Sequence, residues 1–527
     1  MPAVPATTGS RSSLTAVMPP GGLGAILRRH WLFAVLLTLG LVLRVLTQVA
    51  YRPVLLYIDS VKYLFGAYPG NDPPGYQLML RAFLGAGSLS AVAAVQHLCG
   101  LAMAVALYLV LRRRGVPAWL AALGTAPLLL DAYQLQIEQS IMPDTAFEAF
   151  IVAGLVLLLW QPRPAWWMVL AGGAALGASA TMRQVGEILI VPAVVYLLIV
   201  VPGWRAKLTR AVALCALFAV PILLISYRNY MTVRQFGLAP YAAGTIYGRA
   251  AAAADCATLR LPAYEQPLCP SPRQQALGPD WLDHGAGSPV KTLILPPGLR
   301  HVSVDTNFAD RVLRQQPLRV AVAVARDAAK LFAVDRVTDA GDVSIARWQF
   351  QRDYPLYPPY IALAAGHLQF GQFTPAGQPE VIAAGVRYSG TKPAVSSGLA
   401  NFLRGYQLHG GYAPGPLLLL ATLAGLLGSI GVVRRRASAA QRATATACLL
   451  TFGSAAAVLL ASDFFEFSWR YQLPALITLV PAGALGLTVI GSYLAERRQR
   501  GGQAPAPALR PAAAGDPAGA GHPAVTG

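Results

Sequence analysis

Charged side chains are scarce in this chain. Asp, Glu, Lys and Arg make up only 12% of its 527 residues, whereas 55% are hydrophobic and the mean hydropathy is +0.49. A water-soluble protein of this length needs a more polar surface, because about a quarter of the residues in soluble domains are charged. The composition therefore excludes a soluble globular protein and predicts an integral membrane protein.

Acidic residues are scarcer than basic ones, with 23 Asp and Glu against 42 Lys and Arg, for a net charge of +19. A nucleic-acid partner would need this charge on one folded face with aromatic residues between the cations. Instead, the basic residues form short clusters at the ends of apolar runs, which is typical of cytoplasmic loops. The clusters are Arg112-Arg113-Arg114, Arg205-Lys207-Arg210, Arg434-Arg435-Arg436 and Arg497-Arg498-Arg500. We therefore expect no nucleic-acid partner.

Cysteine and histidine are also few, with five and seven residues, and no spacing among them resembles a metal site. No cofactor is indicated, and a divalent ion is left open. Cys99, Cys215 and Cys448 fall in apolar runs, where cysteine is usually a packing residue. Cys256 and Cys269 share the long polar region, so a disulfide between them is a hypothesis, with two free thiols as the alternative.

Long apolar runs predict an all-α polytopic fold with about ten membrane crossings, at roughly 20 residues for each helix. The runs lie near residues 31–50, 89–111, 117–133, 144–160, 165–182, 188–202, 211–227, 414–432, 443–461 and 472–494. With the N-terminus inside, alternation of the helices puts every arginine cluster on the cytoplasmic side. We expect a multi-pass plasma-membrane protein with both termini in the cytoplasm.

The runs also predict the domain organisation. Within the long region between the seventh and eighth runs, apolar residues from 305 to 336 recur at helical spacing, with a break between two helices at Pro317. The N-terminal end is rich in Pro, Ser, Thr and Gly, and the C-terminal tail is rich in Ala, Pro and Gly. Neither composition can bury a core, so both ends are predicted to be disordered. The predicted units are a cytoplasmic N-terminus (1–24), a membrane core (25–227), an extracytoplasmic mixed or helical region (228–413), C-terminal membrane helices (414–495) and a cytoplasmic tail (496–527).

Acidic residues at membrane depth mark candidate functional positions, because an ionisable group beside hydrocarbon is costly and usually functional. The predicted outer ends of the spans carry Asp59, Asp72, Asp131, Glu138, Asp144, Glu187, Asp463 and Glu466, whereas the cytoplasmic loops carry almost no acid. Asp59 lies in an amphipathic segment, residues 57–65, which predicts an interfacial helix. The alternative is that Asp59 only caps this helix or pairs with Lys62. Arg44 and Arg52 are expected to anchor the first span to lipid head groups.

Several short motifs follow one another along the predicted membrane part. They are Asp59 followed by Pro73-Pro74, Met142-Pro143-Asp144-Thr145-Ala146-Phe147 at the fourth span, Ala180-Thr181-Met182-Arg183-Gln184 at the end of the fifth, Tyr227-Arg228-Asn229-Tyr230 with Phe236-Gly237 after the seventh, and Trp469-Arg470-Tyr471-Gln472-Leu473-Pro474 at the last. In this order the chain resembles membrane glycosyltransferases of the type C fold (GT-C), specifically the protein mannosyltransferase and aminoarabinose transferase family. Asp72 stands where that family often has a lysine that contacts the donor phosphate. Lys62 or an arginine elsewhere is the alternative source of this charge, unless the donor is held differently.

The resemblance implies transfer of a sugar from a polyprenyl-phosphate carrier to an acceptor hydroxyl outside the membrane, the acceptor being a glycan, a lipid or a protein. Asp59 would be the catalytic base, with Asp144 orienting hydroxyls or sharing the proton. The candidate phosphate ligands are Arg183, Arg228, Arg470 and Lys62, and snorkelling to lipid phosphate is the alternative role of each arginine. The residues expected to orient the sugar or acceptor are Glu138, Tyr63 and Tyr471.

Two other functions use polar residues among many membrane helices. A transporter or lipid-linked-sugar flippase often has two related halves with paired helix interruptions, whereas this chain has seven predicted spans before the outer region and three after it. A non-catalytic assembly factor would scatter its polar residues over both membrane faces. The glycosyltransferase reading is the one that the order of the motifs favours.

Overall fold

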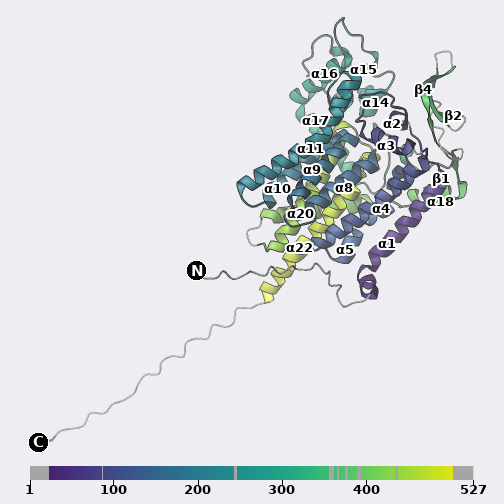
Figure 1. Ribbon diagram of the computed structural model, residues 1–527. Coiled ribbons are helices and arrows are strands. Elements are labelled where there is room, and N and C mark those ends of the chain that lie inside the picture. Colours follow the sequence, from purple (N-terminus) through teal and green to yellow (C-terminus); the bar gives the residue numbers. More distant parts are fainter. Residues whose placement is uncertain are drawn as a thin grey trace, which may run out of the picture.

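The computed structural model describes residues 23–57, 59–85, 87–242, 246–354, 361–364, 367–373, 378–388, 393–433, 437–502 and 526–527. Most of the two predicted disordered ends and the cluster Arg434-Arg435-Arg436 lie outside these ranges. Helices dominate the described part, as predicted, and strands form only two small sheets. Figure 1 shows a bundle of long helices with a smaller helical region and a hairpin-like sheet at one end.

Six apolar helical stretches among the described residues are long enough to cross a membrane. They correspond to α1 (Leu23–Ala50), α4 (Leu89–Arg113), α11 (Trp204–Val233), α19 (Gly415–Ile430), α20 (Ala439–Phe465) and α22 (Leu479–Gly502). The other four predicted spans correspond to shorter helices, namely α5 (Ala118–Leu123) with α6 (Ala126–Leu130), α8 (Asp144–Leu159), α9 (Trp166–Met182), and η1 (Gln184–Leu189) with α10 (Ile190–Val200). The polytopic all-α fold is thus confirmed.

The third predicted span, near residues 117–133, is not one helix. It divides into α5, α6 and the start of α7 (Ala132–Glu138). Pro127 has no N–H to donate to the turn before it, and Asp131 leaves the helical conformation and accepts a hydrogen bond from the N–H of Tyr133 at 2.9 Å. Asp131 is therefore the N-cap that starts α7.

Small residues let the membrane helices approach closely. A Cβ atom on Gly486 of α22 would lie 2.0 Å from the carbonyl oxygen of Ala424 on α19. On α9, a Cβ atom at Gly177 would lie 2.1 Å from the carbonyl oxygen of Phe218 on α11. Glycine at these positions is required by contact between two backbones.

The region between α11 and α19 has a hydrophobic core of its own, built around Tyr247 and Phe308. Cys256 and Cys269 form a disulfide beside it. The predicted helix break at Pro317 is confirmed, because α16 (His301–Gln315) ends just before it and α17 (Pro317–Lys330) starts on it. The remaining helices here are α12 (Ile246–Ala253), η3 (Gln266–Leu268), α13 (Pro272–Gln275), α14 (Gly278–His284), α15 (Pro289–Thr292), η4 (Ile345–Trp348) and α18 (Ser397–Leu408).

Two small antiparallel sheets complete the end of the molecule that the sequence predicts to be extracytoplasmic, which is called the outer end for that reason. Strands β2 (Ile361–Ala364), β3 (His367–Phe373) and β4 (Pro379–Arg387) pair in that order, and β1 (Tyr51–Arg52) pairs with β5 (Ala394–Val395). The first outer loop holds α2 (Ser60–Phe65) and α3 (Gly75–Gly85), and the short helices η5 (Gly431–Val433), η6 (Trp469–Gln472) and α21 (Pro474–Ile477) lie near the last two spans.

Candidate functional site

Asp59 stands immediately before α2 and pairs with two cations. Its side chain makes no capping hydrogen bond to this helix. Instead, Oδ2 lies 3.0 Å from Nη1 of Arg470 and Oδ1 lies 3.3 Å from Nζ of Lys62. Asp59 therefore does not cap α2 through its side chain. It does pair with Lys62, as the alternative interpretation predicted, and it also pairs with Arg470 from the other end of the chain.

Asp144 is the first residue of α8 and is almost fully buried. Arg470 approaches both of its oxygens, with Nε at 3.1 Å from each and Nη2 at 2.9 Å from Oδ2. Nη1 of Arg183 lies 2.5 Å from Oδ1. Arg470 thus bridges two carboxylates from separate outer loops. We call this group the Arg470 cluster; it consists of Asp59, Lys62, Asp144, Arg183 and Arg470.

The backbone and neighbouring rings fix the two guanidinium groups. α9 ends because Arg183 adopts an extended conformation, with φ −143° and ψ 126°. Its guanidinium carbon lies 4.3 Å from the ring centre of Tyr471, and that of Arg470 lies 5.0 Å from the ring centre of Trp348. Such cation–π contacts orient a guanidinium plane without using its N–H donors.

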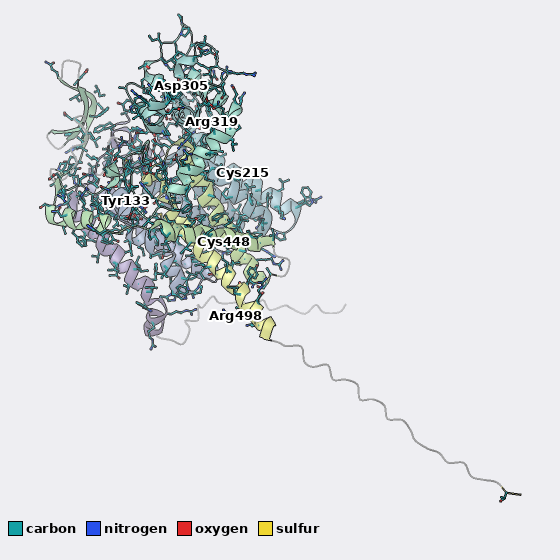
Figure 2. The ribbon with its side chains drawn as sticks, turned by 180° about the vertical axis from the view of Figure 1, so that it is seen from behind. Tyr133, Cys215, Asp305, Arg319, Cys448 and Arg498 are labelled. Atoms are coloured by element: carbon teal, nitrogen blue, oxygen red, sulfur yellow. A yellow bond between two sulfur atoms is a disulfide. The ribbon has the colours of Figure 1, made fainter. Side chains whose placement is uncertain are left out.

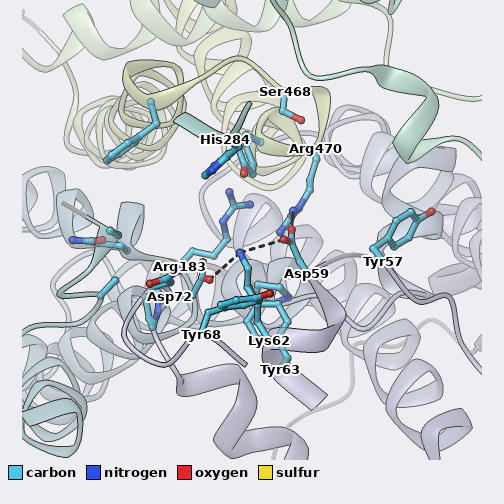
Figure 3. A pocket seen from close by; sticks show the side chains of 18 of the residues that line it. Tyr57, Asp59, Lys62, Tyr63, Tyr68, Asp72, Arg183, His284, Ser468 and Arg470 are labelled. Atoms are coloured by element: carbon cyan, nitrogen blue, oxygen red, sulfur yellow. Dashed lines mark hydrogen bonds and ion pairs between the residues drawn. The ribbon is translucent and has the colours of Figure 1, made fainter. Parts of the chain in front are cut away.

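A cavity of about 910 Å³ opens onto the cluster (Figure 3). Asp59, Lys62, Arg183 and Arg470 line it, and so do the predicted Tyr63 and Tyr471. Asp72 also lines the cavity and lies 3.0 Å from Nζ of Lys62. Lys62 therefore lies between two carboxylates at the cavity wall.

Several cavity residues come from outside the predicted set. Trp348 and three residues of α14, Asp280, Asp283 and His284, belong to the outer region. Glu466, one of the acids predicted at the outer ends of the spans, follows α20 and also lines the cavity. The spacing of Asp280 and Asp283 puts them on one side of a short helix. Nothing in the sequence indicates that this side faces the first outer loop, because that depends on how the outer region packs.

Two acids of the cavity differ in their protonation. Burial alone would raise the pKa of Asp59, but the charges of Lys62 and Arg470 lower it to about 2. For Glu466, burial and then the nearby carboxylate of Asp280 raise the pKa to about 7. The cavity thus combines a carboxylate that is ionised throughout the physiological range with a carboxyl group that titrates near neutrality.

Three predicted positions lie elsewhere. Glu138 is fully buried and pairs with Arg44 at 2.8 Å, so it does not line the cavity. Arg44 is 2% exposed, and its predicted role as a head-group anchor is wrong because its charge is used inside the protein. Arg228 is half-buried on α11, has the cation Arg81 as its charged neighbour, and is not among the cavity residues.

Within the part of the chain that the structure describes, no group of three or more His, Cys, Asp or Glu side chains is arranged to hold a metal ion.

Part of the sequence is similar to one known protein family. Residues 59–236 match the model of dolichyl-phosphate-mannose-protein mannosyltransferase. No curated protein matches the sequence.

The solved structures give more distant similarities. Archaeal oligosaccharyltransferase AglB from Archaeoglobus fulgidus, in complex with an inhibitory peptide and a dolichol-phosphate, is 13% identical, with 91% of this chain and 52% of that chain covered and a TM-score of 0.40. ArnT from Cupriavidus metallidurans, bound to undecaprenyl phosphate, is 15% identical, with 91% and 80% covered and a TM-score of 0.29. The chain thus spans about half the length of the archaeal protein.

The family match bears on the predicted site. It includes Asp59, Lys62, Asp144 and Arg183 of the Arg470 cluster, and it supports the coarser functional prediction, a membrane glycosyltransferase. The predicted resemblance of this chain to the protein mannosyltransferases is confirmed for residues 59–236.

Proposed function

We propose that the protein transfers a sugar from a polyprenyl-phosphate carrier to a hydroxyl group of an acceptor. The observation that carries this proposal is the Arg470 cluster in its cavity, where three cations and two carboxylates from separate parts of the chain meet. A lipid-linked sugar phosphate presents an anionic leaving group and an anomeric carbon. The cluster offers cations that can bind the leaving phosphate and a carboxylate that can act as a base beside the anomeric carbon.

The donor phosphate would bind Lys62, Arg183 and Arg470. Guanidinium suits this role because it stays charged and can grip phosphate oxygens with two parallel N–H groups. The carboxylates hold these cations in place before the donor arrives, so little reorganisation is needed when charge develops on the leaving phosphate. Asp144, with arginine nitrogens at both oxygens, would orient the two guanidinium groups.

Asp59 would be the base. The acceptor oxygen forms a bond to the anomeric carbon, the bond from that carbon to the phosphate oxygen breaks, and its electron pair leaves with the phosphate. The hydroxyl proton moves to Asp59 as the attack develops. Polyprenyl phosphate and the glycosylated acceptor are the products.

Donor binding would activate this base. With a pKa of about 2, Asp59 is a weak base while Lys62 and Arg470 hold it. A phosphate that draws these cations towards itself, and adds negative charge nearby, raises the pKa of a buried carboxylate. Proton transfer would then be favourable only when the donor is in place.

The sugar and the acceptor would occupy the rest of the cavity. Tyr63 and Tyr471 line it and can hydrogen-bond to sugar hydroxyls, which we assign as their role. The acceptor, whether a glycan, a lipid or a protein, would approach between the first outer loop and α14.

We also propose that the cavity is extracytoplasmic and that both termini are cytoplasmic. Figure 2 shows Asp305 and Arg319 of the outer region at the end of the molecule opposite Arg498, which belongs to a predicted cytoplasmic cluster. The positive-inside rule places the arginine-rich end in the cytoplasm.

The purified protein should be incubated with a panel of polyprenyl-phosphate sugars, and released polyprenyl phosphate measured by mass spectrometry. Release from at least one donor, increased by an acceptor, is the expected result. Release from none by a folded protein would contradict the proposal and favour the transporter or flippase alternative.

A further inference from the structure

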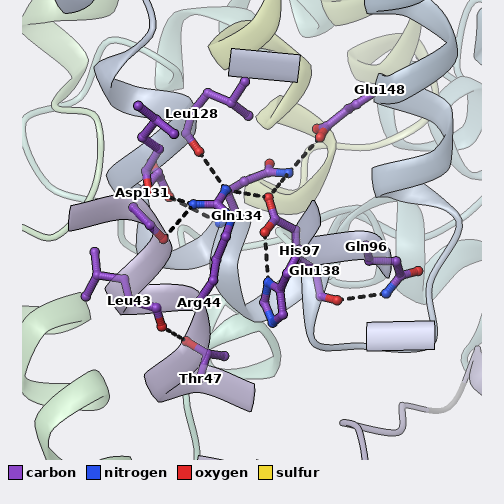
Figure 4. A network of polar contacts seen from close by, with 12 residues as sticks. Leu43, Arg44, Thr47, Gln96, His97, Leu128, Asp131, Gln134, Glu138 and Glu148 are labelled. Carbon is purple, nitrogen blue, oxygen red and sulfur yellow. Dashed lines mark hydrogen bonds and ion pairs between the residues drawn. The ribbon is translucent and has the colours of Figure 1, made fainter. Parts of the chain in front are cut away.

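A second polar cluster is buried in the bundle outside the cavity (Figure 4). Glu138 Oε1 lies 2.8 Å from Nη2 of Arg44, and Oε2 lies 2.9 Å from Nδ1 of His97. All three residues are less than 5% exposed. An ion pair buried this deeply adds little net stability compared with apolar side chains of the same size, so its presence suggests a role other than stability.

The contacts of Glu138 join three helices that are separate in the sequence. Arg44 belongs to α1, His97 to α4, and Glu138 ends α7. Arg44 Nη1 also donates to the carbonyl oxygen of Leu129 at 2.9 Å. On α4, a Cβ atom at Gly100 would lie 2.2 Å from Oε1 of Glu138 and 2.7 Å from Nη2 of Arg44, so the pair requires a glycine there.

The backbone after Glu138 is bound to the backbone before Asp59. The N–H of Leu55 donates to the carbonyl oxygen of Gln139 at 2.9 Å, and the N–H of Ile141 donates to the carbonyl oxygen of Leu55 at 3.1 Å. Oγ of Ser60, the residue after Asp59, donates to the carbonyl oxygen of Ile141 at 3.1 Å. The segment that leads to Asp59 is therefore held against the link that leads from α7 to Asp144.

Two glutamines extend this connection. Nε2 of Gln96 donates to the carbonyl oxygens of Glu138 and Ser140, each at 2.8 Å. Nε2 of Gln134 donates to Oε1 of Glu138 at 3.4 Å and to Oε2 of Glu148 at 2.7 Å. Glu148 lies one turn after Asp144 on α8, so the cluster is tied to the helix that carries this acid.

We propose that Glu138, with Arg44 and His97, is a positioning residue that holds the carboxylates of Asp59 and Asp144 where Arg470 bridges both. This inference rests on the proposed function and adds to it the element that sets the site's geometry. Catalytic geometry is sensitive to such support, since a misplacement of about 1 Å can lower a rate by roughly a hundredfold.

The test is a double variant, Arg44→Leu with Glu138→Leu, compared with the wild-type protein. Removing both partners leaves neither of these two charges buried without the other, and such replacements of an ion pair are often neutral or stabilising. We expect an unchanged unfolding temperature, a turnover number about tenfold to a hundredfold lower with a smaller change in donor KM, and faster hydrogen exchange at the amides of Leu55 and Ile141. Unchanged turnover and unchanged exchange in a stable double variant would overturn the proposal.

A second variant tests the positioning role of Glu138 if the double variant does not fold. Gly100→Ala pushes a methyl group into the ion pair. Gly491→Ala on α22 is the matched control, because no atom outside the adjacent helix backbone lies within 4 Å of the added Cβ. The same loss of turnover and protection is expected only for Gly100→Ala, and wild-type behaviour of a folded Gly100→Ala protein would overturn the proposal. If the wild-type protein transfers no sugar, the proposed function fails, while hydrogen exchange still tests the positioning role.

Discussion

Four of the acidic side chains predicted at the outer ends of the spans pair with cations in two different settings. Asp59 and Asp144 pair with cations at the cavity, whereas Asp131 and Glu138 form buried pairs with Arg336 and Arg44 away from it. Hydropathy and arginine placement predict which end of the bundle each acid occupies. They do not predict which way its side chain faces, because that depends on packing between helices distant in sequence.

Substitution can distinguish an arginine that binds the donor phosphate, Arg183, from one that does not, Arg228. Arg183→Ala is expected to raise the donor KM by roughly tenfold to a hundredfold, because a hydrogen bond to a charged group contributes about 1.5–3 kcal/mol. Arg228→Ala is the matched control and should leave the donor KM unchanged, since this residue does not line the cavity. Donor titration in detergent measures both, and an equal effect of the two substitutions would contradict the site as described.

Glu466 gives the activity a pH dependence. Below its pKa of about 7 the carboxyl group is neutral, and above it the group adds a negative charge to a cavity that must bind phosphate. Donor KM is therefore expected to rise several-fold from about pH 6 to about pH 8. Glu466→Gln should remove most of this rise, as measured by donor titration across that range. A rise that persists in the variant would assign it to another group.

At the scale of elements, periodicity and length predict the helices well and their interruptions poorly. The spans near residues 89–111 and 443–461 correspond to single long helices, and neither contains a proline that would interrupt the helical hydrogen bonds. The run near 117–133 is equally apolar but divides at Pro127 and Asp131. Its division produces α7, which carries Glu138, so the feature that hydropathy missed is one that the positioning of the site uses.

Close helix packing can be tested at Gly486. Gly486→Leu would place side-chain atoms against the backbone of α19, where even a Cβ atom would lie 2.0 Å from the oxygen of Ala424. We expect a loss of about 1–3 kcal/mol or more, as for other overpacked sites, seen as a lower unfolding temperature in detergent. Gly491→Ala should have little effect. An unchanged unfolding temperature for Gly486→Leu would show that α19 and α22 do not pack this closely.

At the scale of the whole molecule, the outer region supplies one wall of the cavity. Trp348 packs on Arg470, and Asp280 and His284 line the opening. These residues lie more than a hundred positions from Asp59 and Arg470 in the chain. Sequence patterns are local, so they predict that an outer region exists but not that it folds over the first outer loop.

The orientation can be measured by labelling single cysteines in a background without the three free cysteines. Leu318→Cys lies on the outer region and Trp204→Cys lies beside an arginine cluster, and both positions are at least 70% exposed. A membrane-impermeant maleimide should label Leu318→Cys in intact cells and Trp204→Cys only after permeabilisation. The reverse pattern would place the cavity in the cytoplasm.

The most direct test of the account measures sugar transfer and polyprenyl-phosphate binding on one Asp59→Asn preparation. Loss of the base should lower transfer by about a hundredfold or more. Binding of polyprenyl phosphate should be kept or become tighter, because Lys62 and Arg470 lose a competing carboxylate. Asp310→Asn, in an exposed pair with Arg314, is the control. Wild-type transfer by the Asp59→Asn protein, or loss of its polyprenyl-phosphate binding, would contradict the account.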